Sequence, residues 1–297
     1  YIALALCEGE IDSVQKIYVD DKEVTWSGSL DNDTSRTVAS SDGNFYKADP
    51  TVEGSSAESL IEVKVHTGTD VQGQCSLLGQ ITNWTSNHKL QGIAYLSLKI
   101  KWNQDAFSGM PTINALVKGR KVYNANLDGS VTGGSGNHRQ GDTSTWEYSD
   151  IPVWNLLDYL RNDRFGKGLA DSDFDSNWAD WQTAADVCSA NVVNVSGGSN
   201  IPLLNCHAVI DTSRNIIDNV RELVKGCRAY LPYSQGKYKI LVETTGSASI
   251  TLNEDDIIGG YSLASESKSN KYNRVIVSFI NPDRNWQVDE VQWPELD

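Results

Sequence analysis

The sequence predicts an α+β fold in which strand-rich segments flank a helical insert. Alternating apolar and polar residues, typical of half-buried strands, dominate the first part of the chain and return near its end. Between them, residues 152–230 show the three- to four-residue apolar spacing of amphipathic helices. Because strands and helices are segregated along the chain, the strict alternation of a parallel α/β sheet is excluded. The 297 residues allow about two domains, and we expect a β-rich domain at 1–148 and an α+β domain at 149–297.

The N-terminal part contains the clearest strand patterns. Residues 1–25 are predicted to be strands with a turn near Asp20, and residues 27–58 to be loop with short strands. Runs with a period of two follow at 61–66, 93–102 and 113–123, the last with a bend at Gly119. Residues 126–149 are rich in glycine, serine and asparagine and are predicted to form a long polar loop.

Three helices are expected in the insert. Pro152 suits the first turn of the first helix, which we expect to end at Gly166. The second helix carries Trp178 and Trp181, and the third has a broad apolar face between Ile216 and Cys227. The predicted N-caps are Ser149 or Asp150, then Ser176 or Asn177, then Thr212 or Ser213. Strands are predicted again at 238–243 and 274–279.

The net charge excludes two large classes of function. Lys and Arg number 25 and Asp and Glu number 39, so the formal charge is −14. Stable nucleic-acid binding requires a basic surface to pair with phosphates, and anionic membranes attract basic segments. No apolar run approaches the 18 residues of a membrane span, so we expect no membrane insertion by this segment. The chain begins at Tyr1 without an initiator Met, and we expect it to be a fragment or a processed product.

The cysteines and histidines give no recognisable metal or disulfide pattern. The five cysteines are odd in number and lack CxxC spacing, so we expect buried free thiols. The four histidines are scattered without HxxxH or HxH spacing, and no metal site or cofactor is predicted. Cys206 and His207 are adjacent, but adjacent residues of a strand point to opposite faces and do not act on one another.

Three further motifs were weighed, and none is assigned a catalytic role. Gly133–Gly136 lacks the Lys-Ser/Thr ending of a phosphate cradle and is interpreted as a flexible surface loop. The alternating acids Asp171, Asp173 and Asp175 resemble a calcium loop but lack its glycine and final glutamate, so a turn is expected. Glu254–Asp256 has no second carboxylate placed by spacing and is interpreted as a solvated turn. We therefore predict no catalytic, cofactor-binding or metal-binding residues, and no enzyme.

Five segments, in order along the chain, together resemble one family. Pro152–Leu169 (PVWNLLDYLRNDRFGKGL) is the most specific, being similar to the family's Tyr-Asp-Leu-Leu-Thr-Asn-x-Arg-Tyr-Gly-Leu-Gly block. The others are Leu6–Val24 (LCEGEIDSVQKIYVDDKEV), His66–Gln74 (HTGTDVQGQ), Asn205–Glu243 and Asn270–Trp286. The chain resembles the tip attachment (host-specificity) protein J family of lambda-like phages, in its central tail hub region. It departs from that family at Asp150-Ile151, where the family often has Asn before Pro, and it ends before the family's fibronectin-like and receptor-binding regions.

The resemblance implies a β-rich hub with barrel domains like those of tail tubes and baseplate hubs. It implies a homotrimer in the virion, at the phage tail tip, assembled in the bacterial host cytoplasm. Such a hub closes the tail tube, joins it to the receptor-binding apparatus and opens for DNA ejection. The implied partners are distal tail or tube ring proteins, the tape-measure protein, and tail fibre or receptor-binding proteins. The tryptophan-bearing helices would pack outside the barrels or between subunits, and the negative charge would keep passing DNA from binding.

Two other functions are kept as alternatives. A secreted carbohydrate-binding module or glycosidase would also use Trp, Tyr, Asp and Asn, although a glycosidase needs two carboxylates at a fixed separation. A tube-initiating ring or assembly adaptor would have a similar strand content. The helical block at 152–230 argues against the adaptor, since such rings are more purely β.

Overall fold

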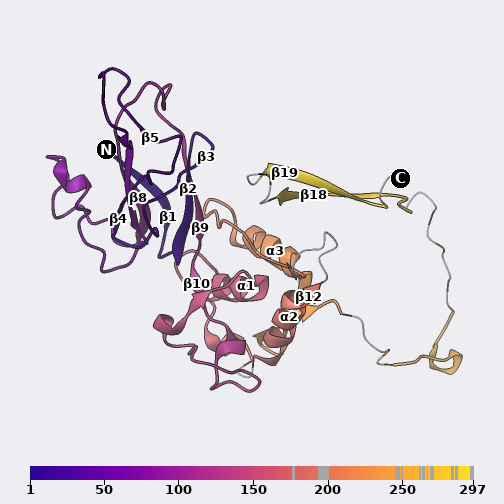
Figure 1. Cartoon of the computed structure of the whole chain (residues 1–297). Helices are drawn as coiled ribbons and strands as arrows, with labels where there is room; N and C mark the ends of the chain where they lie inside the picture. Colours follow the sequence, from indigo (N-terminus) through magenta and orange to yellow (C-terminus); the bar gives the residue numbers. More distant parts are fainter. Residues whose placement is uncertain are drawn as a thin grey trace. The chain divides into compact units, whose positions relative to one another are not determined.

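The computed structural model describes residues 1–175, 178–192, 201–244, 248, 250–260, 262, 265, 267, 271–281, 284 and 287–294 (Figure 1). The chain divides into two units, Tyr1–Thr244 and Thr245–Asp297, which are described separately. The first unit is strand-rich at its start and helical in its second half. The predicted β-rich α+β class is therefore confirmed.

The strands of the first unit's N-terminal part alternate with short loops. In chain order they are β1 (Ile2–Glu8), β2 (Ser13–Val19), β3 (Lys22–Glu23), β4 (Ser35–Thr37), β5 (Tyr46–Lys47), β6 (Glu58–Ser59), β7 (Ile61–His66), β8 (Ile93–Ile100), β9 (Ile113–Lys118), β10 (Lys121–Val122) and β11 (Glu147–Tyr148). The three period-two runs of the sequence correspond to β7, β8 and β9–β10, and Gly119 lies in the break between the last two. All strand pairs between these named strands are antiparallel.

Two of these sheets join into one curved, barrel-like layer. One has the order β1-β8-β7-β4 and the other β3-β2-β9. The chain beyond β3 pairs with the chain around β4: Ser27 N donates to Thr37 O at 2.9 Å, and Ala39 N donates to Thr25 O at 2.8 Å. This seam continues the hydrogen bonding from β3 to β4, so the seven strands wrap round a single core.

The inside of the curved layer is filled by branched aliphatic side chains. Val63 and Val65 of β7 belong to this core, and the residue between them along the strand lies on the outer face, as the period of two requires. Residues of this core that are at most 1 % exposed are Ile17, Val19, Phe45, Ile61, Val63, Val65, Ala94, Leu96 and Leu98. The outer face of β7 and β8 is also covered, because Leu77 and Leu78 from the 67–92 segment pack on Tyr95 of β8.

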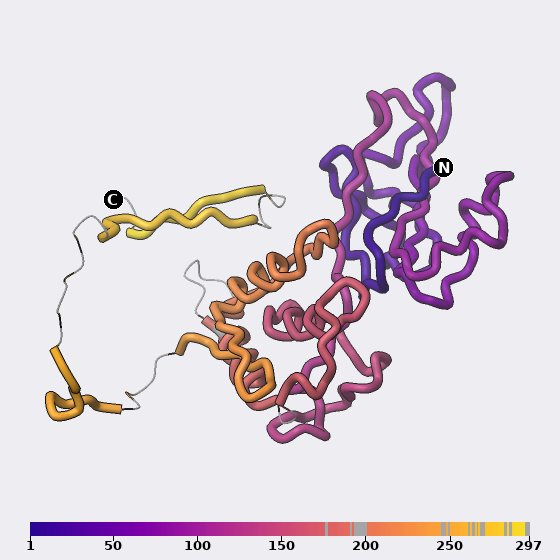
Figure 2. Tube along the Cα trace, turned by 180° about the vertical axis from the view of Figure 1, so that it is seen from behind, coloured from indigo at the N-terminus to yellow at the C-terminus, as the bar shows by residue number. Residues whose placement is uncertain are grey.

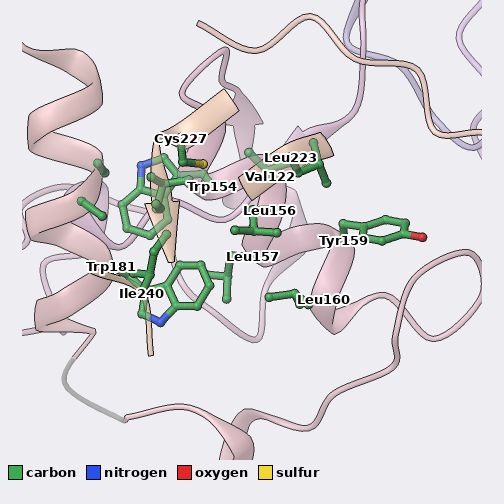
Figure 3. Packing of buried hydrophobic residues seen from close by; sticks show 14 of the residues in the cluster. Val122, Trp154, Leu156, Leu157, Tyr159, Leu160, Trp181, Leu223, Cys227 and Ile240 are labelled. Carbon is green, nitrogen blue, oxygen red and sulfur yellow. The ribbon is translucent and has the colours of Figure 1, made fainter. Parts of the chain in front are cut away.

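The helical part has its own core, built round α1 (Pro152–Arg161). α2 (Ala179–Ser189) and α3 (Ile216–Cys227) both pack against α1, as the front and back views show (Figures 1 and 2). Figure 3 shows the side chains of Trp154 and Trp181 lying with Ile240 and Cys227 in this core. The part also contains the short strands β12 (Asn191–Val192), β13 (Ile201–Pro202), β14 (Ala229–Tyr230), β15 (Tyr233–Ser234), β16 (Lys237–Tyr238) and β17 (Leu241–Val242).

Three tryptophans of the helical part are core residues. Trp154, Trp178 and Trp181 are at most 2 % exposed. Each lies within the aromatic and aliphatic packing of the helical part, where Phe174 contacts both Trp178 and Trp181. Large aromatic side chains supply much of the apolar area that a core can bury. These three residues therefore stabilise this chain and are not available to a partner.

The helix starts match the predictions better than the helix caps do. α1 begins at Pro152 as predicted, but its N-cap is Ile151, and it ends at Arg161, before Gly166. α3 has Asn215 as its N-cap instead of Thr212 or Ser213, and no side-chain cap bond forms at either helix. Trp178 is the N-cap of α2, while the predicted caps Ser176 and Asn177 lie outside the described residues. The strand predicted at 238–243 is divided between β16 and β17.

The proposed domain boundary at residue 148 stays a prediction. The hydrophobic cluster of the curved layer extends to Val117, and that of the helical part begins at Val122. The two clusters belong to one unit that continues to Thr244.

The second unit consists of a short helical turn and a β-hairpin among its described residues. The turn is the 3-10 segment Glu254–Asp256, and the hairpin joins β18 (Val275–Asn281) to β19 (Gln287–Trp293). β18 covers residues 275–279 of the strand predicted at 274–279. β19 lies in the region of about 237–297 where strands were expected, but it was not singled out, because its pattern is interrupted by polar residues.

Candidate functional site

The most sequence-specific segment of the chain forms the turn that follows α1. Asn162 accepts hydrogen bonds at its Oδ1 from the backbone N–H groups of Arg164 and Phe165, both at 3.0 Å. Gly166 lies so close to α1 that a Cβ on it would stand 1.8 Å from the carbonyl oxygen of Tyr159. The Arg-Phe-Gly-Lys-Gly-Leu stretch is therefore needed to reverse the chain tightly against its own helix.

This turn also reaches the curved layer. The Arg164 guanidinium forms an ion pair with Glu8 at the end of β1. A cavity of about 550 Å³ lies beside the pair, lined by residues of β1 and by Gln91, Gly92 and Ile93. The helical part thus contacts the edge strand of the layer through a residue of its tightest turn.

A second cavity lies at the junction of the layer and the helical part. It has a volume of about 560 Å³ and is lined on one side by Gly9, Glu10, Gly68, Asp70 and Gly92, and on the other by Arg120, Lys121, Thr143, Ser144 and Trp146. Gly68 has φ +86°, and a Cβ there would stand 2.7 Å from the Gly9 oxygen and the Ala94 nitrogen. The side of this cavity that belongs to the layer is therefore formed by backbone segments whose close approach only glycine permits.

Two arginine–carboxylate ion pairs connect side chains of the helical part close to this cavity. Arg120 donates to Asp158 at 3.0 Å and Arg161 donates to Asp171 at 2.8 Å. Burial raises the pKa of the Asp158 carboxyl, although Arg120 and Arg161 both oppose that effect. The charges of these four side chains compensate one another. The two ion pairs therefore hold this part of the structure in place and do not activate a substrate.

The predicted flexible loop is ordered round one buried carboxylate. Asp128 is 1 % exposed and accepts hydrogen bonds from Tyr123 Oη at 2.8 Å, Ser130 N at 2.8 Å and Arg139 Nη1 at 3.0 Å. Burial acts to raise the pKa of Asp128, but these donors outweigh it and the pKa lies below its ordinary value. Gly133–Gly136 lies in a surface loop, as predicted, and the loop is closely packed at one point, since a Cβ at Gly134 would collide with the carbonyl oxygens of Asp128 and Ala125.

A buried polar network on the outer face of β7 and β8 superficially resembles a nucleophile with its base. Ser97 Oγ lies 3.5 Å from His66 Nε2, and His66 Nδ1 lies 3.8 Å from Asp33 Oδ1. Ser97 is fully buried, and its hydroxyl already donates to the Lys64 carbonyl at 3.1 Å. Burial lowers the pKa of His66 to about 4, with Lys64 adding to the effect and Asp33 opposing it. The network is therefore a structural one, which no substrate can reach.

The acidic motifs and the Cys206–His207 pair are placed as expected. Asp171 pairs with Arg161, and Asp175 lies within ion-pair distance of both Lys237 and Lys239. Asp173 accepts a hydrogen bond from Ala170 N at 2.9 Å, so the three acids serve a turn. Glu254–Asp256 forms the exposed turn of the second unit.

Cys206 packs against the helical core, whereas His207 is exposed, so the two lie on opposite sides of an extended segment. Cys75, Cys188 and Cys227 are buried free thiols, as predicted, but Cys7 is exposed. Among the residues that the structure describes, no group of three or more His, Cys, Asp or Glu could hold a metal ion. None of the described helices has the length and hydrophobicity needed to cross a membrane.

A group of exposed apolar side chains that the sequence did not reveal lies on the hairpin. In the β18–β19 register, Val275 is opposite Trp293 and Val277 is opposite Val291, so these four side chains share one face with Phe279. We call these five residues the apolar hairpin face. Their exposed fractions range from 42 % for Phe279 to 75 % for Trp293. The same face carries Asp289, which is directly opposite Phe279.

A smaller apolar pair lies on the first unit. Tyr230 and Leu241 are directly opposite one another in β14 and β17 and are 66 % and 52 % exposed. The neighbouring pair, Ala229 and Val242, points the other way and packs on the helical core. Among the described residues, the features that stand out are thus exposed apolar surfaces and a tightly packed turn after α1.

A comparison with known proteins agrees with this geometry. The baseplate hub protein pb3 of Escherichia phage T5 is 22 % identical over an alignment that covers 98 % of this chain and 34 % of pb3. This chain is a distant homologue of a phage baseplate hub protein. It spans about a third of the length of that relative. No protein-family profile matches the chain.

This similarity supports an assignment to the phage tail hub family and a structural role in the tail. It does not single out the tip attachment proteins of lambda-like phages, which the sequence motifs had suggested. It also favours a structural over an enzymatic function.

Proposed function

We propose that this chain is the central hub of a phage tail tip, of the kind that closes the tail tube and joins it to the receptor-binding apparatus. The observation that carries the proposal is the alignment with a baseplate hub protein along almost the whole chain. Two features of the molecule support it: a curved layer of seven strands round one core, and a helical part held against that layer. In this proposal the hub is a homotrimer and opens for DNA ejection.

The proposed partners follow from that position. They are a distal tail or tube ring protein, the tape-measure protein, and tail fibre or receptor-binding proteins. The finer identity, a tip attachment protein of the lambda-like kind, belongs to the same proposal. It is supported by the Pro152–Leu169 segment, whose glycine turn and Arg164 connect the helical part to β1. Assembly would take place in the host cytoplasm before the hub enters the virion.

The net charge of −14 supports a conduit for DNA. Acidic walls repel phosphates, so that a passing duplex does not bind to the hub. In virions with acidic residues of the channel lining changed to their amides, we expect slower or incomplete DNA ejection. An unchanged ejection rate would argue against this part of the proposal.

The proposal is tested by the position of the chain in purified virions. Antibodies against this chain should label the tail tip in electron micrographs, and cross-linked virions should release it as a trimer. Labelling at the capsid or along the tail shaft would overturn the proposal. Glycan binding by the purified chain, with no label on tails, would favour the carbohydrate-binding alternative. Its buried Trp154, Trp178 and Trp181 cannot serve as the sugar platform in that alternative.

A further inference from the structure

The curved layer and the helical part are two distinct parts of the first unit. Each has its own hydrophobic cluster, and the two clusters share no residue. The chain passes from one part to the other through the short segment Lys118-Gly119-Arg120, between β9 and β10. Among the residues that the structure describes, no backbone hydrogen bond joins residues 1–118 to residues 121–244. A short connection between two separately packed parts is the usual form of a hinge.

The two ends of this connection are held by different parts of the unit. Asp12 of the layer donates its backbone N–H to the carbonyl oxygen of Gly119 at 2.8 Å. Arg120 is held by the helical part, since its guanidinium donates to Asp158 at 3.0 Å and lies 5.5 Å from the centre of the Phe165 ring. Nothing lies within 4 Å of the place where a Cβ on Gly119 would stand. The link between Gly119 and Arg120 is therefore unpacked at the point where the contacts of one part end and those of the other begin.

The junction around the link is hollow and mostly polar. The cavity of about 560 Å³ described above separates a layer side with two carboxylates and three glycines from a helical side with two cations, two hydroxyls and Trp146. Separating polar walls exposes little apolar surface, so it costs less free energy than opening a hydrophobic interface. Two parts of a chain are expected to move relative to one another unless a large hydrophobic interface joins them. The junction therefore allows such a movement.

An exposed ion pair crosses the junction away from the link. Arg164, in the turn after α1, pairs with Glu8 at the end of β1, and the two side chains are 72 % and 58 % exposed. An ion pair between exposed side chains is weak and is screened by salt. The pair can therefore hold one arrangement of the two parts and still release it. The contact of Lys118 Nζ with the Tyr148 ring, at 5.4 Å, lies next to the link and would be displaced little by a rotation there.

We infer that the helical part rotates against the curved layer about the link between Gly119 and Arg120, and that the Glu8–Arg164 pair is the latch of the closed arrangement described here. The rotation is a property of the chain itself. Its role in the phage rests on the proposed function: it is the movement by which the hub opens for DNA ejection. Breaking the latch should raise the share of the rotated arrangement by about twofold to fivefold, the effect of one exposed ion pair.

Distances between spin labels test the rotation in the full chain. With Cys7→Ser and Cys206→Ser in place, one pair of labels spans the junction, at Asn114→Cys in β9 and Thr183→Cys in α2. A control pair lies within the helical part, at Thr183→Cys and Glu222→Cys, and all three label positions are exposed. Double electron–electron resonance should give two distances, or one broad distribution, for the spanning pair and a single narrow distance for the control pair. A single narrow distance for the spanning pair would overturn the inference.

Charge substitutions test the latch with a matched control. Glu8→Gln breaks the ion pair that crosses the junction, whereas Glu23→Gln breaks the pair with Lys16, which is also exposed but lies within the layer. Glu8→Gln, or about 1 M salt, should raise the share of the second distance by about twofold to fivefold. Glu23→Gln should leave the distribution of the unchanged chain. Equal effects of the two substitutions, or no effect of Glu8→Gln, would overturn the assignment of the latch.

A reducible cross-link tests the role of the rotation in ejection. Virions with Glu8→Cys and Arg164→Cys, joined by a bismaleimide with a reducible spacer, should retain their DNA until a reductant is added. Control virions with Lys16→Cys and Glu23→Cys, joined in the same way within the layer, should eject normally. Normal ejection from the Glu8–Arg164 cross-linked virions would overturn the role in opening, while the spin-label distances decide the rotation itself. Absence of the chain from the tail tip would overturn the proposed hub and leave the hinge of the purified chain intact.

Discussion

Tyr123 donates a 2.8 Å hydrogen bond to the buried carboxylate of Asp128, at the start of the loop that joins the curved layer to the helical part. The bond raises the pKa of Tyr123 as a secondary cause, after burial of the phenol itself. The same carboxylate binds Ser130 and Arg139, so one acidic residue holds three parts of the loop together.

Replacing Asp128 should destabilise the first unit. Asp128→Asn removes the charge that Arg139 and the Ser130 donors bind, and we expect a loss of about 2 kcal/mol or more in the free energy of unfolding, measured by urea denaturation. Asp142 is the matched control, because it accepts the same pair of bonds from Ser144, at 3.0 and 2.6 Å, on an exposed turn. Asp142→Asn should cause a much smaller loss. Equal losses would contradict the role of burial.

Gly166→Ala should be strongly destabilising. The new Cβ would stand 1.8 Å from the Tyr159 oxygen, so the turn after α1 would have to move, and we expect a cost of at least about 2 kcal/mol. Gly226 lies in α3 with nothing within 4 Å of an added Cβ. Gly226→Ala should therefore stabilise by about 0.5–1 kcal/mol. Thermal unfolding of the two variants should shift in opposite directions, and a shift in the same direction would argue against this packing.

His66 should make stability depend on pH between about 4 and its ordinary value near 6.5. Burial depresses its pKa in the folded chain to about 4. Over this range the unfolded chain therefore binds more protons, so stability rises with pH through the window. Lowering the pH from 7 to 4.5 should destabilise the wild type more than His66→Gln, by on the order of 2 kcal/mol.

The control for this pH effect is His88→Gln, at an exposed histidine of the 67–92 segment. Its pH profile should follow that of the wild type, because this substitution leaves the buried histidines His66 and His138 in place. Parallel profiles for the wild type and His66→Gln would show that His66 is not the group responsible.

Thiol reactivity should separate Cys7 from the three buried cysteines. Cys7 is exposed, whereas Cys75, Cys188 and Cys227 are buried, and burial raises the pKa of Cys188 to about 11. A maleimide should therefore label Cys7 in the native chain within minutes and the three buried thiols only after unfolding. Peptide mapping measures both rates. Rapid native labelling of Cys188 would contradict the packing of the helical core.

Local patterns predicted the elements of this chain well, while their mutual pairing needed the structure. The period of two identified β7 and β8, and Pro152 marked the start of α1. The seam between Thr25 and Ala39 was not predictable, because backbone hydrogen bonds of irregular segments leave no side-chain pattern. Asp128 was missed for a related reason: a lone acid in a polar loop looks solvated until its donors are assembled round it.

The exposure of β18 within its own unit was hidden from the sequence as well. The apolar run Val275–Phe279 indicated a strand, and a strand of that composition is expected to be buried. Its exposure becomes visible only when the rest of the unit is seen to supply no covering layer among the described residues. The burial of Trp154, Trp178 and Trp181 in the core of the helical part likewise became visible only in the structure.

The pairing of β1 with β8 also constrains how the chain folds during synthesis. Ile2–Glu8 is translated before its partner Ile93–Ile100, and the short strands and loops between them are made in the interval. Until β8 has been made, the Ile-Ala-Leu-Ala-Leu-Cys segment lacks this pairing partner and presents an uncharged strand to other nascent chains. Late closure of non-local strands slows folding and prolongs this exposure. We therefore expect the curved layer to depend on chaperones in the host cell more than the locally connected helices do.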